Sequence, residues 1–396
     1  MRPVVTILGG STPFTAALVE ALRSAAGELP ACELRLFGQD GAALERMRRY
    51  ASARLAAAGW VASATARLDD AVEGAGVVVN QIRFGGLSGR ARDEALANRF
   101  QLPADETLGP CGLNAALRIV PRIRELAASL GELCPDAWVL NLANPLSITT
   151  AAMIAAGAPA RCVGLCELPL ATVREACGVL RIPFAEVEWD YVGLNHRGFV
   201  CSLRHQGEDL MPRLPALLGG ETISGVSADE IRAVGALPLK YFRLSTSSTK
   251  AAPCHRAGFL EDLRETLARE LESSSAPPKA LSGRKLDWYE GAVVPMIAAI
   301  FAGDRRQVVV NSLGGDGLVR EAPAWISRDR FEVLAAPRPP LVGPWLDRWQ
   351  AHEQAMLGAI TSPSLERIEH ALALDPAVPQ ALTGEIARAI WAEHAN

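Results

Sequence analysis

The stretch Val4-Val-Thr-Ile-Leu-Gly-Gly-Ser-Thr12 joins a short apolar run to a glycine turn, and a helical pattern follows over residues 15–25. The apolar and β-branched residues at 4–8 predict a buried strand. Glycines after such a strand allow a tight turn, and the amides at the start of the next helix can hold a pyrophosphate. We therefore expect Gly9, Gly10, Ser11 and Thr12 to bind a dinucleotide; a tight turn without a ligand is the alternative.

Strand and helix patterns alternate through the first 165 residues. Short β-rich runs separated by helices of ten or more residues are typical of parallel βαβ units. The sequence predicts strands at 4–8, 33–37, 64–68, 76–80, 137–141 and 162–165, and helices at 15–25, 41–58 and 114–130. We therefore expect residues 1–165 to form a doubly wound, Rossmann-like parallel sheet that binds the dinucleotide.

The pattern changes after Cys166. A long strand-like stretch at 187–203 is interrupted at Gly193-Leu-Asn-His196, and a Ser/Pro-rich segment at 271–283 predicts a surface loop or a mobile lid. Further helices are predicted at 228–234, 256–273, 288–302 and from about 345 onward, with one strand at 307–311. We expect residues 166–396 to form a mixed α+β domain without a dinucleotide pattern of its own.

Composition excludes several classes of protein. The 396 residues contain 40 basic and 44 acidic side chains without a block of like charge, which argues against a nucleic-acid or anionic-membrane surface. The longest apolar run, at 291–302, is too short to span a bilayer, and no signal peptide precedes the first strand. The eight cysteines lie mostly in apolar segments and do not resemble a disulfide framework. A cytoplasmic protein is expected.

Arginines follow the predicted strand at 76–80, where ligands of open α/β sheets bind. Arg83, Arg90 and Arg92 could together clamp an anion, since guanidinium groups fork onto phosphate. The alternative is a solvated helix start in which Asp93 and Glu94 are ordinary first-turn acids.

Other polar residues lie at loops and strand ends. The glycine-rich loop at 105–112 carries a carboxylate, and Asn144 could either hold a sugar hydroxyl or cap the helix after Pro145. The dinucleotide fingerprint is imperfect, because Leu8 occupies its first glycine position. Gly38 stands where an acidic residue would hold the ribose, with Gln39 and Asp40 just beyond.

Three further side chains have the chemistry of a metal or catalytic site. Cys166 ends a buried strand and His196 interrupts another, so they could share a metal ion; a buried thiol and a satisfied imidazole are the commoner outcome. Tyr241 lies beside Lys240 and Arg243, whose charge would lower the pKa of the phenol and favour its use as a base. A packed aromatic ring is the alternative for Tyr241.

Taken in order, these segments form a set that covers nearly the whole chain. It comprises the glycine turn with Leu18-Val-Glu20, Gln81-Ile-Arg-x-Gly-Gly-Leu87, Glu106-Thr-x-Gly-Pro-x-Gly112, Asn141-x-x-Asn-Pro145, Val163-Gly-Leu-Cys-x-x-Pro169, Gly193-Leu-Asn-His196, Pro238-x-x-Tyr241, and Arg284 ahead of Trp288-Tyr289. The set resembles glycoside hydrolase family 4, the NAD- and metal-dependent glycosidases that include 6-phospho-glucosidases.

The resemblance implies an unusual route to hydrolysis. Bound NAD⁺ takes hydride from C3 of the sugar, a tyrosine removes the C2 proton while a metal stabilises the resulting anion, and the aglycone leaves C1 by elimination. Water then adds, and the bound NADH reduces the ketone. By position, the resemblance assigns the metal, which is usually Mn²⁺, to Cys166 and His196, and the base to Tyr241. It assigns contacts with sugar hydroxyls to Glu106 and Asn144. Contacts with the phosphate or other parts of the substrate fall to Arg90 and Arg284.

Departures from the family pattern concern the substrate. The residue after the metal-binding cysteine is Asp in members acting on α-phosphoglucosides, Asn in those acting on β-phosphoglucosides and His in those acting on unphosphorylated sugars, whereas this chain has Glu167, a candidate catalytic residue. Arg197 stands where an apolar residue is common, and Leu244 and Ser245 replace the tyrosines that usually follow Tyr241.

The sequence as a whole predicts a 6-phospho-β-glucosidase that uses NAD and Mn²⁺ and acts as a homodimer or homotetramer. Asp40 and Arg83 complete its expected cofactor contacts. The alternatives are a family member acting on a 6-phospho-α-glucoside, an α-galacturonide or a neutral sugar, a dehydrogenase that releases NADH, and a silent dinucleotide sensor.

Overall fold

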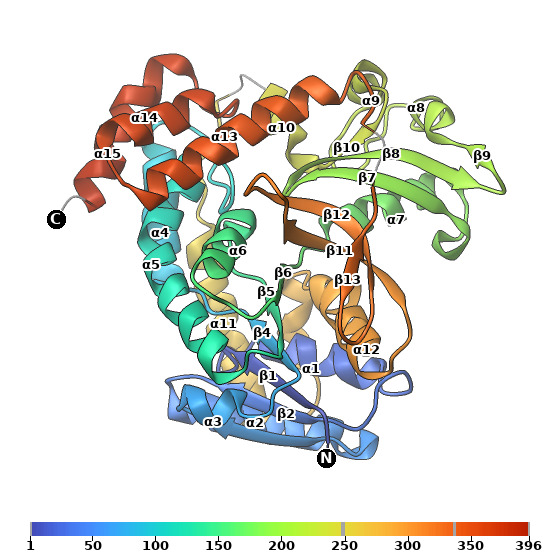
Figure 1. Ribbon diagram of the computed structural model, residues 1–396, viewed down its shortest axis with the longest axis vertical. Helices are drawn as coiled ribbons and strands as arrows, with labels where there is room; N and C mark the ends of the chain where they lie inside the picture. Colours follow the sequence, from blue (N-terminus) through green and yellow to red (C-terminus); the bar gives the residue numbers. More distant parts are fainter. Residues whose placement is uncertain (1, 247–249, 336–337, 395–396) are drawn as a thin grey trace.

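Six parallel strands form the N-terminal part of one long mixed sheet (Figure 1). The structure is a computed structural model that describes residues 2–246, 250–335 and 338–394. The order β3-β2-β1-β4-β5-β6 is that of a Rossmann fold, and every neighbouring pair in it is parallel. The strands are β1 (Val4–Leu8), β2 (Glu33–Phe37), β3 (Val61–Thr65), β4 (Val77–Asn80), β5 (Trp138–Asn141) and β6 (Arg161–Gly164).

Helices cover both faces of the parallel strands, because successive side chains of each strand point to opposite sides. In β1, Val5 and Ile7 pack on one side with α1 and α2, while Val4 and Leu8 pack on the other with α5 and the C-terminal helices. The helices of this half are α1 (Thr15–Ser24), α2 (Gly41–Leu55), α3 (Leu68–Val72), α4 (Gly86–Arg99), α5 (Gly109–Leu133), α6 (Leu146–Ala155) and α7 (Leu168–Leu180).

The strand predicted at 64–68 is displaced. The third strand, β3, covers Val61–Thr65, and Leu68 already begins helix α3. Pairing with β2 decides the register, since Glu33 lies opposite Val61 and Phe37 opposite Thr65. Helices α4 and α7 were not predicted as elements, because α4 has only a weak apolar stripe and α7 follows directly on the cysteine motif.

The second half extends the same sheet with antiparallel strands. Its strands are β7 (Glu188–Leu194), β8 (Arg197–His205), β9 (Glu208–Asp209), β10 (Leu237–Pro238), β11 (Arg306–Leu313), β12 (Val319–Ile326) and β13 (Phe331–Val333). Strand β11 meets β6 where Asn311 lies opposite Gly164, so the parallel and antiparallel parts form one continuous sheet. The predicted class, a Rossmann-like sheet followed by a mixed α+β domain, is confirmed.

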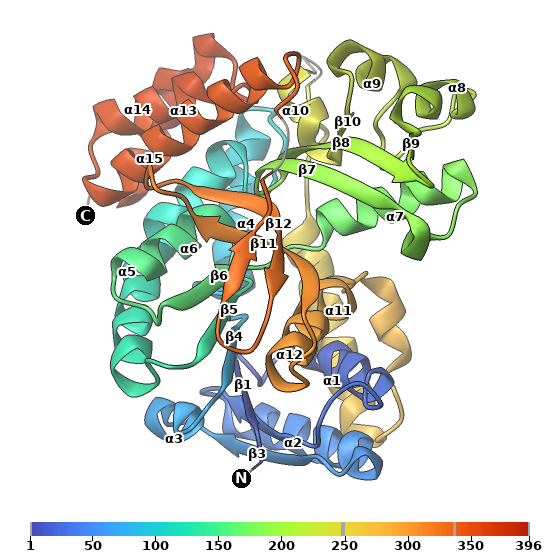
Figure 2. The same cartoon turned by 45° about the vertical axis from the view of Figure 1, so that its right-hand side comes forward.

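The remaining helices surround the antiparallel strands and the α4–α5 side of the molecule. They are α8 (Leu214–Leu217), α9 (Ala228–Val234), α10 (Arg243–Thr246), α11 (Arg256–Ser273), a π-helical turn (Tyr289–Val293) leading into α12 (Val294–Phe301), α13 (Gly343–Thr361), α14 (Leu365–Leu374) and α15 (Thr383–His394). Figure 2 shows α13, α14 and α15 stacked beside α5. None of the helices in the described ranges is long and apolar enough to cross a membrane.

A buried polar cluster joins the C-terminal helices to β8. Arg197, at the start of β8, donates to Nδ1 of His352 at 2.7 Å and to Asp375 at 2.7 Å, and all three side chains are buried. Because Nδ1 accepts, the proton of the neutral ring lies on Nε2, which is 3.2 Å from the second oxygen of Asp375. Glu353, the next residue on α13, is also buried.

This cluster predicts a pH-dependent stability. Burial lowers the pKa of His352 to about 4; Asp375 raises it, but Arg197 lowers it further. Between pH ~6.5 and ~4 the unfolded chain therefore binds a proton that the folded chain does not, and the free energy of unfolding falls as the pH falls. Replacing His352 with Gln should remove about 2–3 kcal/mol of this loss between pH 7 and 4.5. Urea unfolding of both proteins at the two pH values measures it; equal losses would contradict the assignment.

Candidate active site

The glycine turn after β1 is shaped by close contacts with its neighbours. Gly9 has a φ of 85°, and a Cβ there would lie 3.2 Å from the backbone nitrogen of Ile82. The amides of Gly9 and Gly10 donate to the carbonyl of Phe37 at 3.0 and 2.8 Å. These two glycines thus bind the turn to β2, and dinucleotide binding by Gly9, Gly10, Ser11 and Thr12 stays a prediction.

The end of β2 explains one departure from the dinucleotide fingerprint. A Cβ on Gly38 would lie 2.7 Å from Oγ of Ser11, so a carboxylate-bearing side chain has no room at that place. Asp40 is exposed and caps α2, where its side chain accepts from the amide of Ala43 at 3.0 Å. One carboxylate oxygen of Asp40 is used in this way, and a contact between Asp40 and a ribose stays a prediction.

Gln81 connects the glycine turn to the second half of the chain. Its amide nitrogen donates to the carbonyl of Gly9 at 3.2 Å and to Thr15 at 2.8 Å, while its oxygen accepts from the hydroxyl of Tyr289 at 2.6 Å. Tyr289 begins the π-helical turn before α12, a feature frequent at functional sites. Sequence reasoning missed Gln81, although its place directly after β4 was a usable signal.

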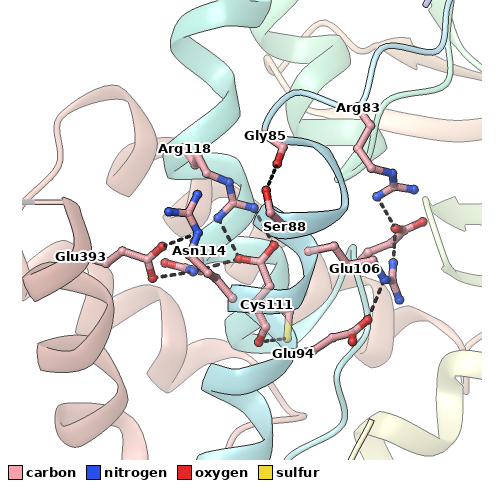
Figure 3. A network of polar contacts seen from close by, with 12 residues as sticks. Arg83, Gly85, Ser88, Glu94, Glu106, Cys111, Asn114, Arg118 and Glu393 are labelled. Carbon is pink, nitrogen blue, oxygen red and sulfur yellow. Dashed lines mark hydrogen bonds and ion pairs between the residues drawn. The ribbon is translucent and has the colours of Figure 1, made fainter. Parts of the chain in front are cut away.

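Four of the predicted residues meet at one carboxylate. Glu106 accepts from Arg83 at 2.9 Å and from Arg90, and Asn144 donates to its other oxygen at 2.9 Å. Figure 3 shows Glu106 beside Arg83 at the edge of α4. Burial alone would raise the pKa of Glu106, but Arg83 and Arg90 outweigh it and hold this pKa far below its usual range. Asn144 does not cap α6, whose first turn has no side-chain cap.

The alternative of a solvated helix start around Arg90 is wrong. Helix α4 begins at Gly86, and Asp93 and Glu94 lie in its middle and are buried. Glu94 accepts from Arg90 at 2.7 Å and from the amide of Ala257 at 3.0 Å, whereas Asp93 pairs with Arg118 of α5. Arg92 is exposed and turns toward Glu393, 3.8 Å away, so it does not join the anion clamp.

Arg284 is a cation among aromatic rings. Its guanidinium lies 4.8 Å from the ring centre of Phe14, just after the glycine turn, and 5.2 Å from that of Trp288. Burial lowers the pKa of Arg284 to about 10; Glu106 raises it, but Arg83 lowers it further. Within the described residues, the guanidinium of Arg284 makes no ion pair and no hydrogen bond; its backbone amide donates to the carbonyl of Leu281 at 3.2 Å.

The rings of His196 and Tyr241 lie against each other, and Cys166 lies nearby; a metal ion shared by Cys166 and His196 stays a prediction. The ring of His196 stacks on that of Tyr241, with centroids 4.4 Å apart and planes at 21°. Cys166 is buried and, after burial itself and Asp105, is among the groups that raise the pKa of Tyr241, while His196 partly offsets the raised pKa of Glu321. His196 occupies the β7–β8 turn with a φ of 64°, which is unusual for a residue with a side chain.

The side chains of Cys166 and His196 suit a metal ion that takes its further ligands from solvent or substrate. His196 Nδ1 is buried without a hydrogen-bond partner, which is a polar atom in need of a ligand or proton acceptor. Burial, then Glu167 and Glu321, raise the pKa of the Cys166 thiol well above its usual range, so a metal would have to displace its proton. Across residues 2–246, 250–335 and 338–394, no three His, Cys, Asp or Glu side chains form a ready-made metal site.

The predicted effect of Lys240 and Arg243 on Tyr241 is wrong. Burial, and then the charges of Asp105, Cys166 and Glu106, raise the pKa of Tyr241 far above its usual value. Lys240 lies over the face of the ring, 4.7 Å from its centre, and Arg243 is exposed and points toward Gly225. Adjacent positions in a helical turn point in different directions, so neighbours in sequence need not reach the hydroxyl.

Two carboxylates near these residues were missed. Asp105 lies 3.8 Å from His196 Nδ1, and its Oδ1 accepts from the amides of Thr107 and Leu108. Glu321, on β12, is fully buried and accepts from Tyr191 at 2.6 Å and Asn195 at 3.1 Å. Asp105 had a signal in its loop next to Glu106, but Glu321 had none, because β12 reaches the site only through sheet pairing.

Glu167 follows Cys166 at the start of α7. One of its carboxylate oxygens lies 3.9 Å from Sγ of Cys166. Its Cβ faces Gly291 of the π-helical turn, where an added Cβ would lie at 3.5 Å. The geometry places this acid beside the cysteine, and its catalytic role stays a prediction.

Comparison with known proteins identifies the family. A probable 6-phospho-β-glucosidase of Bacillus subtilis (strain 168) is 28% identical over 345 residues, 81% of this chain and 77% of that protein. The solved 6-phospho-β-glucosidase of Thermotoga maritima with manganese, NAD⁺ and glucose-6-phosphate superposes with a TM-score of 0.85 at 20% identity, over 99% of this chain and 98% of that one. A 6-phospho-α-glucosidase from gut microorganisms, solved with NAD and Mn²⁺, gives the same TM-score, identity and coverage.

Two family models match in sequence order. The model of family 4 glycosyl hydrolases matches residues 3–182, and that of the family 4 glycosyl hydrolase C-terminal domain matches residues 191–378. The predicted resemblance is thereby confirmed, and the chain belongs to the family 4 glycosyl hydrolases.

Proposed function

We propose that this family 4 enzyme is a 6-phospho-β-glucosidase that requires NAD and a divalent metal, with Mn²⁺ as the preferred ion. The Bacillus subtilis relative that aligns with most of the chain carries that name, and the solved relatives hold NAD and Mn²⁺. We also propose that it acts in the cytoplasm as a homodimer or homotetramer, and that residues 1–165 and 166–396 act as cofactor and substrate domains.

The environment of Arg284 is the observation that supports an anionic sugar as the substrate. Arg284 is a partly buried cation held between Phe14 and Trp288, and it is not neutralised by an acid in the described parts of the chain. Arg83 and Arg90, by contrast, already share Glu106. A buried charge without a partner is costly, and a phosphate supplies both the opposite charge and oxygens for the guanidinium fork.

Cys166 and His196 would hold the metal, and the turn at 9–12 with Asp40 and Arg83 would hold the cofactor. When bound, NAD⁺ accepts and returns a hydride at C3, and the metal stabilises negative charge that develops on the sugar oxygens. The orphan Nδ1 of His196 and the buried thiol of Cys166 fit such an ion.

The remaining residues bind the sugar and move protons. Glu106 and Asn144 would hold hydroxyl groups, with Arg83 and Arg90 keeping Glu106 ionised. Tyr241 would take the proton from C2, and its stacking on His196 fixes the ring for that task. Glu167 would donate a proton to the leaving aglycone oxygen and later take one from water.

A second candidate substrate is a 6-phospho-α-glucoside. Glu167 is a carboxylic acid, as is the Asp found after the cysteine in members that act on α-phosphoglucosides. The anomer therefore has to be measured with both substrates in parallel.

The test of the proposed function is a panel of 4-nitrophenyl α- and β-glucosides, with and without a 6-phosphate, assayed with NAD⁺ and Mn²⁺. We expect the phosphorylated β-glucoside to be cleaved fastest, with no NADH accumulating in the quenched reaction because the NADH formed is used again. Stoichiometric NADH release would identify a dehydrogenase. Rapid cleavage in cofactor-free, chelated buffer would exclude the mechanism.

Replacing Arg284 with Met should weaken selection for the phosphate. Loss of a charged hydrogen-bond partner at a partly buried site costs on the order of 2–4 kcal/mol, so kcat/KM for the phosphorylated substrate should fall by about 30–1,000-fold. Turnover of the unphosphorylated glucoside should change less than threefold. Arg305→Met is the matched control, since Arg305 also lies over an aromatic ring, that of Trp325, and pairs with Glu332. Equal losses with both substrates would contradict phosphate binding by Arg284.

A further inference from the structure

We infer that Asp375 is a positioning residue for the metal site, acting through Arg197 and Gly109. This inference rests on the proposed function, because it assigns the metal to Cys166 and His196. Asp375 lies just after α14, and its contacts join the C-terminal helices to two loops that carry site residues.

The first connection runs to the turn that carries His196. This residue has a left-handed φ of 64°, a conformation that persists only where the surroundings hold it. Its neighbour Arg197 is 2% exposed and donates one guanidinium nitrogen to Asp375 and another to His352, each at 2.7 Å. The side chain of Arg197 therefore anchors the chain immediately after the turn, at the start of β8.

The second connection runs to the loop that carries Asp105 and Glu106. The other carboxylate oxygen of Asp375 accepts from the amide of Gly109, the first residue of α5, at 3.0 Å. Gly109 has a φ of 69°, so this loop also leaves the regular backbone at the point of contact. One carboxylate thus holds both loops, and Asp105 lies 3.8 Å from the His196 ring where they meet.

The free-energy cost of burying the Arg197–Asp375 ion pair supports a role for this pair beyond stability. A buried ion pair loses its hydration, and apolar residues of similar volume often serve stability equally well or better. The position of Arg197 next to His196, and the reach of Asp375 to a second loop, give the pair a geometric function.

Mn²⁺ binding tests the inference directly. Asp375→Asn removes the charge and leaves a side chain of the same size. We expect the Kd for Mn²⁺, measured on metal-free protein from the electron paramagnetic resonance signal of free Mn²⁺, to rise by about 10–100-fold. The Kd for NAD⁺ should stay within threefold, since the glycine turn makes no contact with this cluster.

Arg54→Met is the matched control. It breaks the ion pair with Glu20, at 2.7 Å between α1 and α2, which is partly buried and has no link to either loop. The Kd for Mn²⁺ of this variant should stay within threefold of the wild type. A tenfold rise in the control, or a change below threefold in folded Asp375→Asn, would overturn the inference.

A charge-free variant covers the case in which Asp375→Asn does not fold. Arg197→Met combined with Asp375→Leu leaves no unpaired ion in the core, and it should fold while binding Mn²⁺ about tenfold or more weakly. Wild-type affinity in this double variant would overturn the inference. If wild-type protein itself binds no Mn²⁺, the proposed metal dependence fails instead, so the two failures are distinguishable.

Discussion

Replacing Tyr241 with Phe should lower kcat by about 10²–10⁴-fold with little change in substrate binding. A positioned general base contributes this much to proton transfer, and Phe keeps the ring that stacks on His196 at 4.4 Å. The variant therefore loses the hydroxyl and not the packing. Steady-state cleavage of the phosphorylated aryl glucoside, with Mn²⁺ and NAD⁺ saturating, gives kcat and KM.

Deuterium labelling at C2 of the sugar tests the role of Tyr241 by a second measurement. In D₂O the product of either protein should carry deuterium at C2, because elimination breaks that C–H bond in every turnover, and Tyr241→Phe should form labelled product about 10²–10⁴-fold more slowly. Tyr50→Phe is the control, because it removes the hydroxyl of a buried tyrosine that donates to a carboxylate, Glu20 at 2.7 Å, but lies between α1 and α2. Full C2 labelling by Tyr241→Phe at wild-type rate would exclude this tyrosine as the base.

The environment of Tyr241 links its role as a base to the metal. Burial and the neighbouring Asp105, Cys166 and Glu106 keep the hydroxyl protonated in the protein alone, because they raise its pKa. A divalent cation held by Cys166 and His196 would oppose these negative charges and favour the phenolate. Activity should therefore depend on the metal even where substrate binding does not.

Replacing Cys166 with Ser, or His196 with Asn, should abolish stimulation by Mn²⁺ and lower kcat by about 10³-fold or more. A metal supplies several kcal/mol of stabilisation to developing charge, and a hydroxyl or amide is a far weaker ligand than the group it replaces. Turnover measured against Mn²⁺ concentration, after chelation of the purified protein, gives both effects.

Cys162→Ser is the matched control for the cysteine. Cys162 lies on β6, four residues before Cys166, and is also buried, but its pKa is raised by burial alone. We expect normal Mn²⁺ stimulation in this variant. Normal stimulation in Cys166→Ser as well would remove the cysteine from the metal site.

The local pattern was sufficient for the first two strands and for several helices. The bounds predicted for β1, β2, α9 and α11 agree with the structure, because each combines a clear periodicity with a turn or cap at its ends. Helix α9, for example, begins with a capping box formed by Ser227 and Glu230. The bounds of β3 were wrong, because pairing with β2 and not composition decides its register.

The candidate site was predicted in part. The motifs indicated Glu106, Asn144, Arg90 and Arg83, and the structure brings all four together in one network. The motifs could not exclude Arg92, because only the direction of α4 turns that side chain toward Glu393. Lys240 was misinterpreted for the same reason, since its distance along the chain says nothing about which part of Tyr241 it reaches.

The sequence by itself determined the family, the Rossmann-like half and the residue types available for chemistry, because these depend on local periodicity and on ordered motifs. Only the tertiary structure decided which charges are paired: Glu106 pairs with Arg83 and Arg90, and Asp375 pairs with Arg197, whereas the guanidinium of Arg284 has no acidic partner among the described residues. Arg197 and Asp375, for example, lie 178 residues apart in the chain, and burial sets the strength of each pair. Both properties arise only when the chain folds.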